Sequence, residues 1–102
     1  MNTTYRQGDI LFISMDGPIK TDTVATGSLE VAQGEVTGHA HVIHAEMIGF
    51  DTDWDKNVSR LDLPQGGTLR HDEHAEIALP PGSYSVRRQR EYAYARSVPA
   101  DD

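Results

Sequence analysis

The sequence contains no cysteine among its 102 residues. Disulfide bonds, thiolate-bound zinc and cysteine nucleophiles are therefore excluded. Small secreted domains often depend on disulfides, so their absence favours a cytoplasmic protein. No hydrophobic run approaches the length of about 20 residues that a membrane-spanning helix needs, so we expect no membrane partner.

Basic residues are scarce, since nine Lys and Arg stand against sixteen Asp and Glu, for a net charge of −7. An acidic chain repels phosphate backbones on average, so nucleic acid is not an expected partner. The exception is residues 87–96, a basic strip with four Arg and one Glu. Such a strip is typical of a solvated strand face or of an intramolecular partner for the acidic body, and contact with an anion is the alternative.

Amphipathic helical periodicity is also missing. Instead, the chain divides into about six or seven short strand-like segments separated by glycine and proline turns. This pattern is typical of an all-β domain, either a small barrel or a sandwich. The length fits one domain. We therefore predict a single β domain over residues 1–102, with residues 93–102 as a frayed tail.

Four segments carry most of this prediction. The continuous apolar run at residues 10–13 predicts a strand buried on both faces. Residues 38–50 are expected to be extended, because glycines flank a β-branched stretch. Residues 68–79 alternate in polarity as one strand would. Pro80-Pro81-Gly82 then predicts a tight turn, and the strand at residues 83–89 completes a predicted hairpin.

All five histidines lie in two short clusters, His39-x-His41-x-x-His44 and His71-x-x-His74. Side chains two positions apart on a strand point the same way, so His39 and His41 can reach one ion. Neutral imidazole suits zinc, iron, copper or nickel. We therefore expect the clusters to meet and to hold a divalent transition metal, with zinc or iron preferred. The predicted metal ligands are His39, His41, His71 and His74.

The second cluster needs a local irregularity, because His74 points away from His71 in an unbroken strand. A bulge or turn at Asp72 and Glu73 would bring both imidazoles to one side. Nearby carboxylates supply further candidates. Glu46 is a candidate metal ligand, and Glu73 is a candidate general base or a group that orients an imidazole. We treat Glu73 and Glu46 as the candidate catalytic residues.

Gly34, His39, His41 and Glu46 resemble the first metal-binding motif of the cupin family. Cupins are small β-barrels that hold iron, manganese, zinc or nickel with two His, one Glu and a later His. The resemblance implies that His39, His41 and Glu46 are ligands. The chain departs from the cupin pattern in two places: the interval before His39 is one residue short, and no His follows Pro80-Pro81-Gly82.

A second resemblance spans most of the chain. The segments QGDILFI, GEVTGHAHVI and HDEHAEIALPPGSYSVRRQREY are similar to a family of small uncharacterised bacterial and phage proteins. This resemblance implies one compact domain and no particular activity.

The leading functional hypothesis is a metal-binding β domain, in its enzymatic form a hydrolase or an oxygenase-like enzyme acting on a small molecule. The first alternative is a metal-free enzyme in which His and Glu exchange protons, for instance to cleave a phosphodiester. The second is an acidic regulatory protein that binds a protein partner by charge complementarity. A homo-oligomer is compatible with each hypothesis.

Overall fold

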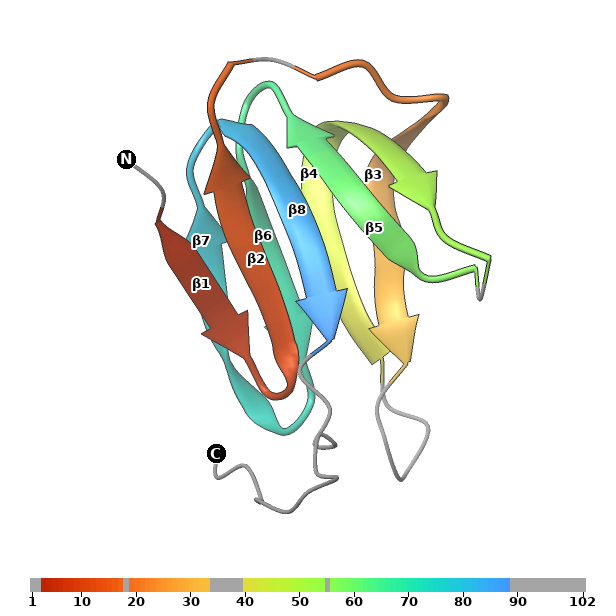
Figure 1. The fold of residues 1–102 in the computed structure, drawn as a ribbon. Helices are drawn as coiled ribbons and strands as arrows, with labels where there is room; N and C mark the ends of the chain where they lie inside the picture. The colour runs from red at the N-terminus through yellow and green to blue at the C-terminus, as the bar shows by residue number, and fades with distance from the viewer. Residues whose placement is uncertain (1–2, 18, 34–39, 55, 89–102) are drawn as a thin grey trace.

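The structure is a computed structural model that describes residues 3–17, 19–33, 40–54 and 56–88. These residues form eight β-strands, which confirms the predicted all-β class (Figure 1). The strands are β1 (Thr4–Gln7), β2 (Ile10–Met15), β3 (Thr23–Gln33), β4 (Ala40–Thr52), β5 (Val58–Leu63), β6 (Gly67–His71), β7 (His74–Leu79) and β8 (Gly82–Arg88). No helix in the described part of the chain could cross a bilayer.

The strands form one antiparallel sheet in the order β1-β2-β8-β5-β4-β6-β7, and β3 pairs with β4 outside this path. The long strand β4 pairs with β6 near its start and with β5 near its end. The sheet curls until its two end strands, β1 and β7, lie near each other. The result is a nearly closed barrel whose seam runs between β1 and β7 (Figure 1).

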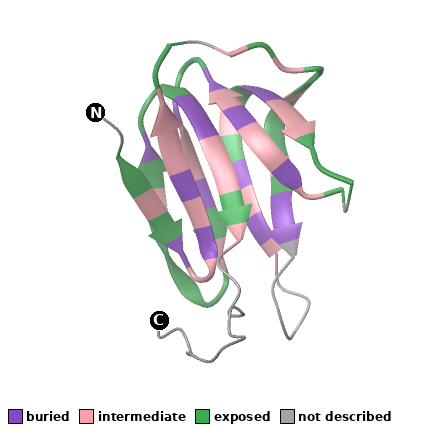
Figure 2. Ribbon diagram, in the orientation of Figure 1, coloured by how far each residue is buried: buried purple, intermediate pink, exposed green. Residues whose placement is uncertain are grey.

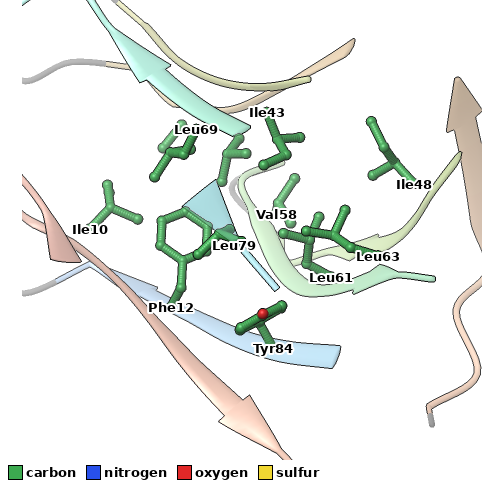
Figure 3. Packing of buried hydrophobic residues seen from close by; sticks show 12 residues of the cluster. Ile10, Phe12, Ile43, Ile48, Val58, Leu61, Leu63, Leu69, Leu79 and Tyr84 are labelled. Carbon is green, nitrogen blue, oxygen red and sulfur yellow. The ribbon is translucent and has the colours of Figure 1, made fainter. Parts of the chain in front are cut away.

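The core fills the inside of this barrel. Buried and more exposed residues alternate along most strands, as a sheet with one inner face requires (Figure 2). Apolar side chains from β2, β4, β5, β6, β7 and β8 meet in one cluster that Figure 3 shows. Phe12, Leu61 and Tyr84 are among its largest buried members.

Two expectations from the sequence are wrong in detail, and one strand was not predicted. The run at residues 10–13 is buried on one face only, with Ile10 and Phe12 inside and Leu11 half-buried, because β2 lies in a sheet with a single core face. Residues 68–79 form two strands that pair with each other instead of one. The polar residues 4–7 gave no strand signal, yet they form β1.

The predicted hairpin around Pro80-Pro81-Gly82 is also wrong. The chain does turn there, and the Tyr84 hydroxyl donates a hydrogen bond to the Pro80 carbonyl. However, β8 leaves β7 and pairs with β2 and β5. Two prolines lack the N–H groups that a hairpin ladder would need at this point.

Candidate functional site

Three histidines from three strands meet at one end of the barrel. His41 is at the start of β4, His71 ends β6 and His74 begins β7. The ring centres of His41 and His71 are 4.3 Å apart, those of His71 and His74 are 4.6 Å apart, and those of His41 and His74 are 6.0 Å apart. We call these three residues the histidine cluster. The two sequence segments that the metal hypothesis needs therefore do come together.

The β6–β7 hairpin explains why His71 and His74 share a side. A two-residue turn, Asp72 and Glu73, joins the strands, so His71 and His74 are directly paired across them. The register then shifts before Leu69 pairs with Ile77, which is the signature of a β-bulge in β7. The turn and the bulge together give the irregularity that the sequence required.

Gln7, at the end of β1, connects the seam of the barrel to the histidine cluster. Its side chain is 2% exposed. The amide nitrogen donates hydrogen bonds to the carbonyls of Leu69, at 3.2 Å, and Ala75, at 2.9 Å. The amide oxygen lies 2.9 Å from Nδ1 of His41. One side chain therefore bridges β1, β4, β6 and β7 at the point where β1 and β7 do not pair.

These contacts fix the tautomer of His41. Two carbonyls can only accept, so they orient the Gln7 amide with its nitrogen toward them and its oxygen toward His41. Nδ1 of His41 must then carry a proton and donate it to that oxygen. In the neutral ring, Nε2 is left with its lone pair, which is the state that a metal ligand or a base requires.

Burial keeps His41 neutral. His41 is only 1% exposed. Desolvation is therefore the main reason why the pKa of His41 falls from 6.5 to about 4. His71 lowers this pKa further, Asp9 opposes the change, and His74 and Arg88 make smaller contributions that lower it. At neutral pH the Nε2 lone pair is therefore available.

Gly8 allows the β1–β2 turn to approach the rings. Its φ of +63° lies in the left-handed region, which glycine adopts without a steric penalty. A side-chain carbon at this position would lie 2.8 Å from Nε2 of His74 and 3.3 Å from Cε1 of His41. The turn at residues 8–9 therefore lies against the histidine cluster.

His71 is oriented differently from His41. Its Nδ1 accepts a hydrogen bond from the backbone N–H of Glu73, at 3.0 Å, so a neutral ring carries its proton on Nε2. As the rings stand, no group of three or more His, Cys, Asp or Glu among the described residues is arranged to hold a metal ion. Coordination by His71 would require its ring to turn and to release this hydrogen bond.

The other predicted site residues are distributed more widely. His39 lies outside the described residues. His44 is exposed on the outer side of β4, where it lines a surface depression together with Arg70, His71 and Glu76. Glu46 is exposed five residues beyond His41 on β4, about 16 Å away at the usual strand rise. The cupin-like ligand set with Glu46 is therefore not assembled.

Glu73 is exposed at the tip of the β6–β7 hairpin, and its backbone orients His71. The sequence interpretation missed Gln7, Gly8 and Asp9. The only local signal for them was the glycine after Gln7, which marks a turn but does not indicate what the turn approaches.

Comparison with known families gives one match. Residues 6–89 match the family described as "Domain of unknown function (DUF8820)". The chain belongs to this family. The match covers every strand from β2 to β8 and includes Gln7 and the whole histidine cluster. Comparisons with curated proteins and with solved structures each found no match.

Proposed function

We propose that the histidine cluster binds a divalent transition metal, with zinc or iron preferred. The observation that carries this proposal is the meeting of three imidazoles from three strands, with ring centres 4.3 to 6.0 Å apart. Two imidazoles that bind one zinc at about 2.0–2.1 Å have ring centres roughly 5 Å apart. The spacing of the cluster is therefore close to that of a shared ion.

Gln7 supports the same proposal. Metal-binding histidines usually donate their second ring N–H to an oxygen, which fixes the tautomer and the ring plane. His41 makes this contact with the Gln7 amide oxygen. The turn of His71 that coordination needs would break one hydrogen bond, which costs about 0.5–1.5 kcal/mol. This cost is small beside the ~10–16 kcal/mol that a structural zinc site contributes in small domains.

The low pKa of His41 favours the metal hypothesis over a metal-free acid–base mechanism. A general base works best when its pKa lies near the working pH. A ring with a pKa of about 4 is a weak proton acceptor at neutral pH, but it is an effective ligand because no proton competes for Nε2. The cluster is therefore better suited to hold a metal than to remove protons by itself.

In the enzymatic form of the proposal, a bound metal would polarise a substrate oxygen or activate water. His41, His71 and His74 would hold it, and Gln7 would keep His41 in the ligating tautomer. Glu73, at the hairpin tip, directly precedes His74 in the sequence and is the candidate for proton transfer. The reaction class that we propose is hydrolysis or oxygen-dependent chemistry on a small molecule.

The test is a cobalt titration of the full chain, followed by visible absorption and calorimetry. We expect about one equivalent to bind, and His74→Gln to weaken binding at least ~100-fold. His44→Gln is the matched control, since it removes an imidazole on the outer side of β4, and it should bind as the wild type does. Absence of binding, or equal weakening in both variants, would refute the proposal.

A further inference from the structure

Exposed apolar side chains gather on and beside the outer face of β3 and β4. In the described part of the chain, the large hydrophobic residues that are exposed are Val24 (63%), Met47 (48%) and Trp54 (88%). Val24 belongs to β3, Met47 belongs to β4, and Trp54 lies in the turn that follows β4. Scattered exposed apolar residues need no explanation, whereas a concentration of them in one region marks an interaction surface.

A bulge in β4 places Met47 beside Glu46 on this face. The register between β3 and β4 shifts there, so that Glu46 and Met47 together oppose Thr26, which is the signature of a β-bulge. Ala45 before them and Ile48 after them pack toward the core. The two residues between are therefore both exposed, and an apolar and an acidic side chain lie next to each other.

This face also carries negative charge without a compensating cation of its own. Neither β3 nor β4 contains a lysine or an arginine. Glu30 of β3 lies between Leu29, which packs against the core, and the buried Val31, so its side chain points outward. Among the described residues, no ion pair engages Glu30 or Glu46. The face therefore offers apolar contacts together with two available carboxylates.

The nature of β3 limits what can cover this face. Within the described structure β3 pairs with β4 alone, so it is an edge strand (Figure 1). The edge is irregular, because Gly27 has a φ of +88° and the register with β4 shifts on both sides of residues 27–30. Such irregularities oppose the addition of a further strand. A second copy of the chain would also bring like charges together, since each copy has a net charge of −7.

The charge and the dimensions of the face define its partner. We propose that the acidic–apolar face, made of Val24, Glu30, Glu46 and Met47, binds an extended basic segment of a protein partner. Val24 and Glu30 are six residues apart on β3, which is about 20 Å at the usual strand rise. Apolar side chains of the segment would cover Val24 and Met47, and its Lys or Arg residues would pair with the two carboxylates. This inference does not depend on the proposed metal site.

The experiment is an amide-resonance NMR titration of the full chain with a capped peptide of about eight residues that alternates lysine and valine. We expect saturable shifts on β3 and at residues 44–47 of β4, with an affinity that falls as salt is added. The same peptide with glutamate in place of lysine should not bind. Glu30→Lys should weaken binding at least ~5-fold, and Met47→Gln should weaken it at least ~3-fold.

Asp16→Lys is the matched control for net charge. It makes the same charge change at an exposed residue that follows β2, and it should bind the peptide within about 2-fold of the wild type. Glu30→Gln keeps the size and removes the charge, so it should also weaken binding, and it remains informative if Glu30→Lys does not fold.

Three results would overturn the inference: no saturation, equal weakening in Asp16→Lys, or binding of the glutamate peptide. A dimer of the free chain in analytical ultracentrifugation that Met47→Gln dissociates would also overturn it, because a second copy would then cover the face. None of these results bears on cobalt binding by the histidine cluster, so the two proposals fail separately.

Discussion

Replacing Gln7 by Leu tests whether one buried amide holds the seam of the barrel and the histidine cluster together. Leucine has a similar size and can occupy the same space, but it cannot form hydrogen bonds. The substitution removes the contacts with the carbonyls of Leu69 and Ala75 and the contact with Nδ1 of His41. Three polar groups would then lose their partner at a position that is 2% exposed.

The expected loss of stability follows from these three contacts. A typical hydrogen bond contributes about 0.5–1.5 kcal/mol, and a buried group left without a partner costs about 1–3 kcal/mol. Because leucine recovers some stability through apolar burial, we expect a net loss of about 2–4 kcal/mol. For a domain of this size, each kcal/mol lowers the melting temperature by roughly 4–8 °C. The melting temperature should therefore fall by about 10–25 °C.

Differential scanning calorimetry measures this effect directly. Gln65→Leu is the control, because it makes the same chemical change at an exposed turn residue. Gln7→Glu adds a second comparison, since a carboxylate can accept the proton of His41 but cannot donate to the two carbonyls, and it should also destabilise. If Gln7→Leu melts within roughly 2 °C of the wild type, the bridging role of Gln7 is wrong.

Two further predictions concern the histidine cluster. The pKa of His41 is about 4 in the folded protein and 6.5 in the unfolded chain. Between these two pH values the unfolded state binds a proton at His41 and the folded state does not. His41 should therefore reduce stability as pH falls from 6.5 toward 4, by at most about 3 kcal/mol. Urea unfolding across this range should show a shallower pH dependence in His41→Phe, and an equal slope would contradict the prediction. Gly8→Ala should lower stability more than Gly17→Ala in the same assay. Both positions have positive φ, but only at Gly8 does the added carbon approach His74; equal losses would show that crowding is unimportant.

The sequence predicted the fold class well because its signals are local. Alternating polarity and glycine and proline turns depend on neighbouring residues, and they indicated an all-β domain with strands near residues 58–63 and 83–89. The same local rule recognised that His71 and His74 need a turn or bulge to face one another. The structure contains both features: a turn joins the strands at residues 67–71 and 74–79, and a bulge interrupts their pairing.

Pairing between distant strands could not be predicted from local sequence patterns. A proline turn after residue 79 suggested a hairpin, yet β8 pairs with β2, more than 60 residues earlier in the chain. Which strands become neighbours depends on how the whole sheet closes over its core, and many pairings satisfy the same alternating pattern.

Sequence by itself determined that this protein is a small β domain rich in histidine at two places. Tertiary structure decided which histidines meet: His41, His71 and His74 share one end of the barrel, whereas His44 lies on the outer surface. It also brought Gln7 to His41 across 34 positions of the chain. The physical reason is that closure of the barrel places β1 beside β7. A buried polar side chain at this seam needs hydrogen-bond partners on distant strands, and local sequence patterns do not indicate which strands these are.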